Sequence, residues 1–392
     1  MSPRRPEVAD IIRAFGAAYR ERFSVHAQQA QVLDDLALCR TAALGGHKLE
    51  CDKCGHQEIS YNSCRNRHCP KCQAAARAEW LAERERDLLQ VPYFHVVFTL
   101  PEELSWILLR NKRLGYGLLM RTAAKTLQTI ASDPRHLGAE IGFLAVLHTW
   151  SQSLLHHPHV HCVVPGGGIA LDGTRRWIAC RKNFFLPVRV LSRLFRRLFL
   201  QALQKAFEQG ELQLHGRLAK LQEPKSWADL LSTLRRKEWV VYSKPPFGGP
   251  LQVLKYLARY THRVAISNAR LVSFEDGRVC FRWKDRAENG RHKEMTLDAV
   301  EFLRRFLLHV LPKGFMRIRH FGFLANRSRK KKLALARELI AEERQSESED
   351  AGSVAALPIL QDEPRKCPQC DNGILQILDT ILPVEGAIDD SS

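Results

Sequence analysis

Apolar residues recur along this chain with two different periods, and each period predicts a different kind of element. Over residues 8–15 and again over 30–39 they return at the spacing of one helix face. Three later segments are instead short and almost continuously apolar, which is typical of buried strands: "YFHVVFTL" (93–100), "GFLAVLHTW" (142–150) and "HVHCVV" (159–164). The first fifty residues are therefore predicted to be helical and the middle of the chain to contain a sheet.

Further helical patterns alternate with these strands, and one hairpin is expected. The helical patterns cover residues 74–89, 104–130, 187–208, 250–262 and 296–310. Asp276 and Gly277 stand between two strand-like runs over 270–283, which predicts a two-residue hairpin turn. Helices and strands mixed in this order predict an α+β fold.

Length and composition place the chain among ordinary globular proteins. It has 392 residues, of which 45% are hydrophobic and 26% charged, enough for two or three domains. No window approaches 18 uninterrupted apolar residues, and the first residues, "MSPRRPEVAD", lack the apolar core of a signal peptide. We expect a soluble, cytoplasmic protein.

Charge divides the chain into three parts. Residues 91–337 hold 43 basic and 17 acidic side chains, whereas residues 338–392 hold 3 basic and 13 acidic ones. A basic excess this extended favours a polyanionic partner, and nucleic acid first, because lysines and arginines that neutralise phosphates release counterions. We expect domains over 1–90 and 91–337, and a flexible acidic tail over 338–392.

Cysteines are concentrated near the N-terminus in a pattern typical of zinc ligands. Of the eleven in the chain, five lie between residues 51 and 72. The pairs Cys51/Cys54 and Cys69/Cys72 are separated by fourteen residues, which suits one tetrahedral thiolate site. The spacing therefore predicts a structural Zn²⁺ held by these four residues.

Other donors leave the ligand set and the number of zinc ions open. Possible additional ligands are Cys64, His47, His56 and His68, and "CPQC" near the C-terminus (Cys367 and Cys370) is half of a further site. Arg65, Arg67 and Lys71 are interleaved with the ligands, which favours DNA contact by the zinc-binding segment.

A histidine pair lies in the last of the three strands. Side chains alternate across a strand, so His159 and His161 are expected on one face while Val160 points into the core. Two imidazoles on a rigid sheet can hold a divalent cation and leave coordination positions for substrate oxygens. An isolated His-x-His is more often two polar residues on a solvent-exposed face. Whether this pair binds a metal must therefore be decided from another element of the sequence.

That element is "VLKYLARYTHR" (253–263), where two tyrosines are separated by one helical turn. Tyr256 and Tyr260 are expected on one helix face, about 6 Å apart. An aromatic pair at this spacing is more often core packing. Here, however, it is surrounded by cationic side chains suited to phosphate, namely Lys255, Arg259, Arg263 and His262.

With these motifs in place, the chain resembles the two-tyrosine transposases of the HUH endonuclease superfamily, specifically the rolling-circle insertion sequence 91 family. The matching stretches span about residues 39–327 in one order: "CRTAALGGHKLECDKCG", "YNSCRNRHCPKCQ", "YFHVVFTLP", "HPHVHCVVPGGG", "YLARYTHRVAISN" and "LPKGFMRIRHFGFLANR". A zinc knuckle, a His-hydrophobic-His strand and a Tyr-x-x-x-Tyr helix together make this resemblance specific.

The resemblance implies a transposase that cleaves and rejoins single-stranded DNA at transposon ends and target, with no nucleotide cofactor. His159 and His161 would hold a catalytic Mg²⁺ or Mn²⁺, with Gln152 as the candidate third ligand and His262 as its rival. Tyr256 and Tyr260 would be nucleophiles that form a 5′-phosphotyrosine. The implied fold is an HUH catalytic domain over 91–337 with a central antiparallel, ferredoxin-like sheet.

Two other functions remain open at this stage. The same nicking chemistry could serve a replication initiator or relaxase, although the zinc-knuckle order argues against it. The chain could also be a catalytically inactive, zinc-containing DNA-binding remnant of a transposon, but the intact histidines and tyrosines disfavour this function. Gly166–Gly168 lack the Lys-Ser/Thr ending of a phosphate-binding loop and are expected to bring backbone close to DNA or to a neighbouring strand.

Overall fold

The computed structural model describes residues 5–244, 264–285, 288, 290–347, 365–370 and 372–384. Its compact units are discontinuous in sequence. Among the described residues, unit 1 is drawn from Met1–Ala82, His262–Val310 and Val354–Ser392, and unit 2 from Glu83–Thr261 and Leu311–Ser353. The three consecutive domains expected from charge therefore differ from the units that contacts define. The units are determined by which segments pack together, and the composition along the chain does not reveal this packing.

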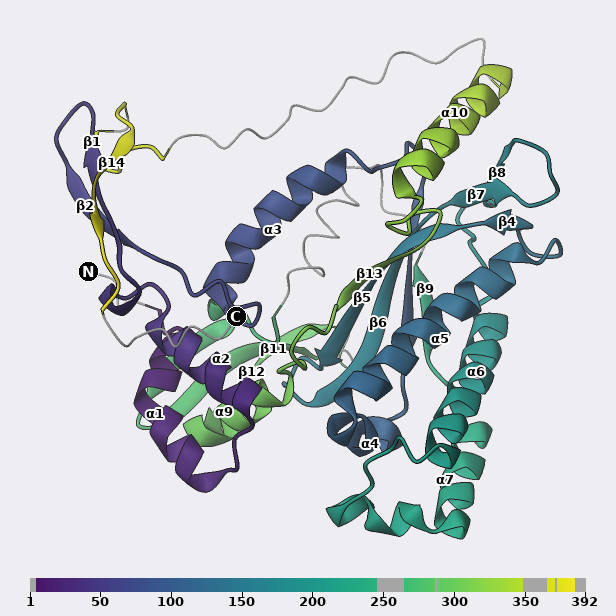
Figure 1. Cartoon of the computed structure of the whole chain (residues 1–392), viewed down its shortest axis with the longest axis horizontal. Helices are drawn as coiled ribbons and strands as arrows, with labels where there is room; N and C mark the ends of the chain where they lie inside the picture. Colours follow the sequence, from purple (N-terminus) through teal and green to yellow (C-terminus); the bar gives the residue numbers. More distant parts are fainter. Residues whose placement is uncertain are drawn as a thin grey trace. The chain divides into compact units, whose positions relative to one another are not determined.

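The larger part of unit 1 is a helical layer on a three-stranded sheet (Figure 1). The helices are α1 (Val8–Arg22), α2 (Ala27–Leu38) and α9 (Ala299–Leu308), and the sheet has the order β10 (Leu271–Glu275), β11 (Arg278–Asp285), β12 (Arg291–Asp298). The rings of Phe15 and Phe274 are 5.9 Å apart, and those of Phe281 and Phe302 are 6.0 Å apart. The first contact holds β10 to the N-terminal helix α1, and the second packs α9 on β11.

The predicted hairpin between β10 and β11 is confirmed. Asp276 and Gly277 both have positive φ angles, 49° and 71°. Both central residues of a type I′ turn need this conformation, which aspartate tolerates and glycine adopts freely.

A second, smaller sheet of unit 1 joins both ends of the chain. Its order is β14 (Leu375–Ile381), β1 (Gly46–Cys51), β2 (Gln57–Tyr61), and β1 pairs antiparallel with both neighbours. Helix α3 (Pro70–Glu85) begins after the cysteine-rich loop. The flexible tail expected over 338–392 is therefore wrong for residues 375–381, because their backbone groups pair with β1.

Unit 2 is built on an antiparallel sheet of five strands (Figure 1). Their order across the sheet is β13 (Ile318–Gly322), β5 (Gly142–Trp150), β6 (His156–Pro165), β3 (Tyr93–Thr99), β9 (Val241–Lys244). Helices α4 (Ser105–Arg110) and α5 (Lys112–Ser132) connect β3 to β5, and α6 (Val188–Glu208) and α7 (Pro224–Arg236) connect β6 to β9. Unit 2 also contains α10 (Arg329–Glu347) and a small sheet of β4 (Ala139–Glu140), β7 (Gly167–Ala170) and β8 (Trp177–Ala179).

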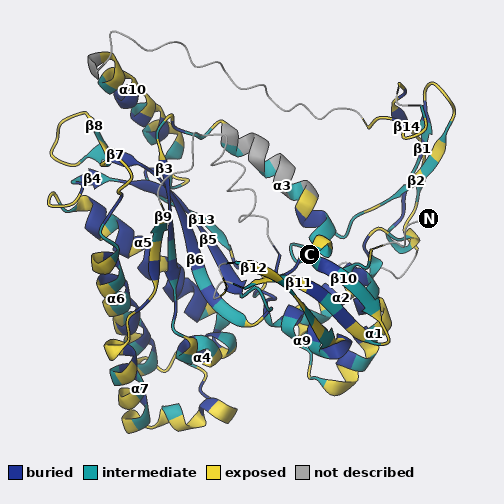
Figure 2. Ribbon diagram, turned by 180° about the vertical axis from the view of Figure 1, so that it is seen from behind, coloured by how far each residue is buried: buried dark blue, intermediate teal, exposed yellow. Residues whose placement is uncertain are grey.

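One face of the five-stranded sheet carries the main core. Phe98, Leu147 and Val160 point from three adjacent strands into a cluster that α5 and α6 complete. Figure 2 shows how thoroughly β5 and β6 are buried. Burying one such side chain contributes about 1.5–3 kcal/mol, so this cluster fixes the register of the central strands. Alternate residues of the same strands then face the opposite side.

The α+β prediction and the antiparallel central sheet are confirmed, and the three predicted strands match β3, β5 and β6. The helix expected over 104–130 is divided at Asn111 into α4 and α5. The helix expected over 250–262 lies outside the described residues. Within the described ranges, no helix combines the length and apolar character needed to cross a membrane.

Candidate metal centres and nucleic-acid contacts

Three histidines gather on the face of the central sheet that lies opposite the main core. His159 and His161 alternate with buried Val160 on β6, as predicted. His148 joins them from β5, where it is the direct antiparallel partner of His159. One nitrogen from each ring lies within 4.8 Å of the others, close enough for all three to bind one cation.

Hydrogen bonds on the far side of two rings orient this cluster. His159 Nδ1 lies 2.6 Å from the carbonyl oxygen of His157, so Nδ1 donates and Nε2 keeps its lone pair. His161 Nδ1 lies 2.8 Å from Nε2 of His95, a buried residue of β3. When His161 donates to His95, Nε2 of His161 keeps its lone pair and can act as a metal ligand, which is the usual outer-shell arrangement of histidine sites.

The cluster is more enclosed than an exposed strand face would be. His148 is 2% exposed and His161 is 5% exposed, while His159 is half-buried. The ring of His148 also stacks on Trp150, with centroids 4.6 Å apart. Partial burial strengthens electrostatic interactions with a bound cation.

His148 is the site residue that sequence reasoning missed. In the strand "GFLAVLHTW", Leu144 and Val146 lie on the same face as His148. The signal that the sequence offered was therefore a polar residue near the end of an otherwise apolar strand. The predicted ligand Gln152 lies in the turn between β5 and β6 and remains a prediction. Both predicted nucleophiles and their neighbours lie outside the described residues, namely Tyr256, Tyr260, Lys255, Arg259, His262 and Arg263.

His156, which also lies on β6, has a structural role. His156 Nδ1 lies 2.7 Å from Ser105 Oγ, and its Nε2 lies 2.8 Å from the hydroxyl of Tyr116. Both ring nitrogens therefore fasten β6 to helices α4 and α5. Burial raises the pKa of Tyr116, which keeps this phenol neutral.

Eight of the eleven cysteines form two groups of four, which corrects the predicted ligand set. The first group comprises Cys39, Cys64, Cys69 and Cys72, and the second comprises Cys51, Cys54, Cys367 and Cys370. The two Cys-x-x-Cys pairs expected to share one ion therefore belong to different groups. The physical reason is that β1 and β2 carry the first pair away from α3, whose N-terminus carries the second pair.

The first group has the dimensions of a tetrahedral thiolate site. Cys39 Sγ lies 3.6 Å from Sγ of both Cys69 and Cys72, and Cys64 Sγ lies 3.6 Å from that of Cys72. A tetrahedron with Zn–S bonds of about 2.3 Å has edges of about 3.8 Å. Hydrogen bonding with the Cys64 thiol, and to a smaller extent with the Cys69 thiol, lowers the pKa of Cys39 to about 7.

The three basic residues predicted to contact DNA near this group have different surroundings. Lys71 Nζ forms a 2.6 Å ion pair with Glu7, so its charge is already neutralised within unit 1. Arg67 is partly buried, and desolvation lowers its pKa. Arg65 is exposed, and its backbone has the left-handed φ of 52°. Contact of these three residues with DNA remains a prediction.

The triple glycine serves close packing between strands. A Cβ on Gly167 would lie 2.5 Å from Nε1 of Trp177, and a Cβ on Gly168 would lie 2.6 Å from the backbone oxygen of Glu140. Both glycines lie in β7, which is sandwiched between β4 and β8. Of the two roles expected, the approach to a neighbouring strand is the one that the structure supports.

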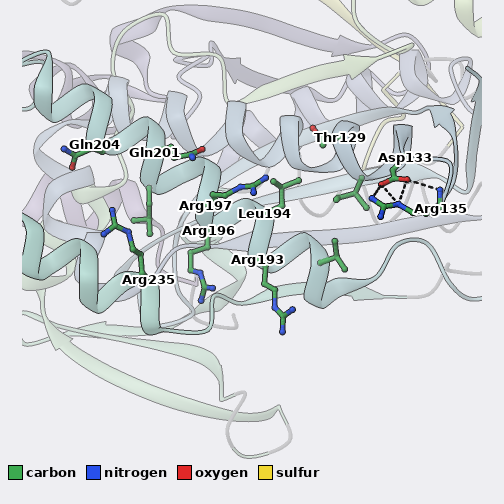
Figure 3. Close-up of a pocket in the computed structure, with 13 residues that line it drawn as sticks. Thr129, Asp133, Arg135, Arg193, Leu194, Arg196, Arg197, Gln201, Gln204 and Arg235 are labelled. Carbon is green, nitrogen blue, oxygen red and sulfur yellow. Dashed lines mark hydrogen bonds and ion pairs between the residues drawn. The ribbon is translucent and has the colours of Figure 1, made fainter.

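An arginine-lined groove lies on the helical side of unit 2 (Figure 3). Its volume is about 790 Å³, and its lining includes Arg193, Arg196 and Arg197 of α6 and Arg235 of α7. At its end, Arg135 is paired with Asp133 at 2.7 Å, whereas Arg196 donates to the carbonyl oxygen of Lys237. The remaining positive charges favour an anionic partner, because side chains of one sign in a groove focus the field.

Two protein-family models match the chain. The model described as "Putative transposase" matches residues 142–332, which include the three histidines and the Tyr-x-x-x-Tyr segment. The model described as "Transposase zinc-binding domain" matches residues 11–100, which include Cys39 and the five cysteines between residues 51 and 72. No solved structure matches the chain.

Two curated proteins are similar over most of their length. The chain is 56% identical over 386 residues to "Putative transposase y4qJ" of Sinorhizobium fredii, covering 97% of each chain. It is 30% identical over 302 residues to "Transposase for insertion sequence element IS801" of Pseudomonas savastanoi pv. phaseolicola, covering 76% of this chain and 71% of that one.

Proposed function

Since the chain belongs to the insertion sequence 91 family of transposases, with an N-terminal zinc-binding domain, we propose that it cuts and rejoins single-stranded DNA in rolling-circle transposition. The observation that carries this proposal is the three-histidine cluster on the central sheet, inside the segment that matches the transposase model. A DNA substrate also agrees with the net charge of +18.

The topology of unit 2 supports an HUH catalytic domain. Its elements follow the succession β3, α4/α5, β5, β6, α6/α7, β9, and their order across the sheet places β6 and β3 between β5 and β9. This is the ferredoxin-like β-α-β-β-α-β arrangement, here with β13 added at one edge. The histidine pair lies on β6, the middle strand, as the HUH assignment requires.

A divalent cation fits the cluster because the ligand atoms converge and two rings are oriented from behind. His148, His159 and His161 would hold it. When bound, it would supply Lewis-acid stabilisation of charge on the scissile phosphate. An all-imidazole set favours a transition metal over Mg²⁺, which prefers oxygen ligands, so we expect Mn²⁺ to be the better activator.

The chemistry that we assign to the tyrosines is a reversible transesterification. The hydroxyl oxygen of Tyr256 or Tyr260 would form a bond to phosphorus, and the bond to the 3′-oxygen of the preceding nucleotide would break. The phenolic proton ends on that 3′-oxygen, directly or through solvent, so charge balances. A phenol with a pKa of about 10 needs nearby positive charge to react at neutral pH. Attack by a 3′-hydroxyl on the phosphotyrosine would rejoin the DNA.

Two tyrosines give the protein a way to hold one DNA end while cutting another. On the helix that the sequence predicts over 250–262, residues four apart lie about one turn from each other. Either phenol could then approach one phosphate, but both could not react together. Strand transfer requires this alternation. A replication initiator or relaxase would use the same step, but the match to an insertion-sequence transposase favours transposition.

We also propose that the arginine-lined groove contacts the DNA backbone away from the site of cleavage. Its side chains project from α6 and α7, on the face of the sheet opposite the histidine cluster. Arginine suits this role because its planar guanidinium forms paired hydrogen bonds to phosphate oxygens.

Covalent adduct formation on single-stranded DNA from the flanks of the gene, with Mn²⁺, tests the nucleophiles. Tyrosine-to-phenylalanine changes keep the ring and remove only the hydroxyl. We expect each of Tyr256→Phe and Tyr260→Phe to bind DNA, at least one to form an adduct, and neither to complete strand transfer. The double variant should form none. An adduct mapped to a serine, or cleavage by the double variant, would refute the mechanism.

A second comparison tests the metal ligands. We expect His148→Ala to lose cleavage, as His159→Ala should, because each supplies one of three converging nitrogens. Gln152→Ala measures whether the amide adds a further ligand. Cleavage by His148→Ala at the wild-type rate over a range of Mn²⁺ concentrations would exclude His148 from the site.

A further inference from the structure

The Cys-x-x-Cys turn near the N-terminus faces the one near the C-terminus, although Cys54 and Cys367 are 313 residues apart in the sequence. Cys51 Sγ lies 3.7 Å from Cys370 Sγ, and Cys54 Sγ lies 3.6 Å from Cys367 Sγ. All four sulfur atoms lie within 4.8 Å of one another. These separations are far longer than a disulfide bond of about 2.05 Å and close to the edge of about 3.8 Å in a zinc–thiolate tetrahedron.

The two turns also repeat one local geometry. The backbone N–H of Lys53 donates to Cys51 Sγ at 3.4 Å, and that of Gln369 donates to Cys367 Sγ at 3.4 Å. In each turn, therefore, the residue two positions after the first cysteine stabilises negative charge on sulfur. Hydrogen bonds to the charged form favour the thiolate, which is the form that binds metal.

A glycine makes room for the sulfur atoms. A Cβ on Gly373 would lie 2.2 Å from Cys51 Sγ and 3.2 Å from Cys370 Sγ. Around it, the backbone N–H of Cys367 donates to the carbonyl oxygen of Gly373, and that of Asp52 donates to the carbonyl oxygen of Ile374. The backbone of the C-terminal turn is thus seated directly against the N-terminal one.

Apolar burial around this group is too small to hold the chain ends together. Besides the cysteines, the cluster contains only Leu49 and Leu375 among the described residues. Burying two leucines contributes about 3–6 kcal/mol, which is comparable to the entropy cost of ordering only a few residues. Small modules of this kind usually depend on a structural metal, because metal binding supplies the missing folding free energy.

We propose that Cys51, Cys54, Cys367 and Cys370 form a second structural Zn²⁺ site, whose ligands come in pairs from the two ends of the chain. The match to the zinc-binding domain model ends at residue 100 and does not include the C-terminal pair. The site fastens β14 to β1, so the C-terminal segment is a structural part of the zinc-binding region. Four thiolates leave no open position, so the ion is structural and takes no part in cleavage.

Zinc stoichiometry of the purified full-length chain tests this proposal directly. We expect two zinc ions per wild-type chain and one in Cys367→Ser/Cys370→Ser, measured by elemental analysis and native mass spectrometry. Cys280→Ser is the matched control, because Cys280 lies on β11 outside both groups, and it should keep two ions. One ion in wild type, iron in place of zinc, or two ions in the double variant would overturn the proposal.

A second variant keeps all four ligands and tests the geometry. Gly373→Ala places a methyl group against Cys51 Sγ, so we expect its second zinc to be lost to a chelator at least tenfold faster than in wild type. Amide hydrogen exchange of residues 375–381 should rise in both variants, while that of α1 stays unchanged. Unchanged zinc loss in Gly373→Ala, or unchanged exchange of β14 in the double variant, would contradict the site.

Discussion

Replacing His95 with phenylalanine tests how the proposed catalytic cation is oriented, separately from the chemistry on DNA. His95 is 5% exposed, its Nε2 lies 2.8 Å from His161 Nδ1, and the two rings are nearly parallel with centroids 5.0 Å apart. Phenylalanine keeps the stacked ring and removes the acceptor. His161 then loses the hydrogen bond that directs its other nitrogen toward the cation.

The expected size of the effect follows from this contact. A buried ring N–H left without an acceptor costs about 1–3 kcal/mol. Loss of an outer-shell partner weakens metal binding by about 10–100-fold, which corresponds to about 1.4–2.8 kcal/mol. We therefore expect the Mn²⁺ concentration for half-maximal adduct formation to rise by about 10–100-fold in His95→Phe, with the rate at saturating Mn²⁺ largely recovered.

Two further variants serve as controls. His95→Gln places an amide oxygen where Nε2 was, so its Mn²⁺ dependence should lie within a few-fold of wild type. His156→Phe removes two hydrogen bonds on the same strand, so it should lower thermal stability without shifting the Mn²⁺ midpoint. An unshifted midpoint in His95→Phe, or a lower saturating rate with no shift, would refute an orienting role for His95.

Three other predictions concern the groove, the first cysteine group and the triple glycine. Arg193→Gln/Arg197→Gln should weaken single-stranded DNA binding and reduce the salt dependence of log K by about 0.7 per lost phosphate contact. Arg135→Gln, whose charge is already paired, should change little, and equal effects would argue against the groove. Cys69→Ser should release one of two zinc ions and lower the melting temperature of unit 1, whereas a full zinc content would exclude Cys69 as a ligand. Gly168→Ala should destabilise unit 2 by about 1–3 kcal/mol in chemical denaturation, because its Cβ meets backbone; an unchanged midpoint would show that β7 can shift.

Local periodicity was sufficient to predict the central strands and the shared face of His159 and His161. Strand alternation is a property of consecutive residues, so Val160 in the core and a histidine on each side of it follow from sequence. The hairpin at Asp276 and Gly277 was equally local, because turn conformation depends on which residues tolerate positive φ.

The partners of these residues depended on tertiary structure. His148 and His95 reach the pair through the registers of β5 and β3 against β6, and a register is decided by how whole apolar faces fit together. His148 lies near the end of an apolar strand and His95 lies inside another, and neither position by itself indicates a metal site.

The cysteines show the same division between local and long-range information. Sequence alone determined that Cys-x-x-Cys turns offer paired thiolates to an ion, because that geometry lies within four residues. It did not determine which pairs share an ion: Cys51 and Cys54 meet Cys367 and Cys370, while Cys69 and Cys72 meet Cys39 and Cys64. Pairing between β1 and β14 brings the two ends of the chain together, whereas Cys69 and Cys72 lie at the N-terminus of α3. Short sequence segments thus determine which side chains can bind a metal. Which of these side chains share one ion depends on the free energy of packing distant segments together.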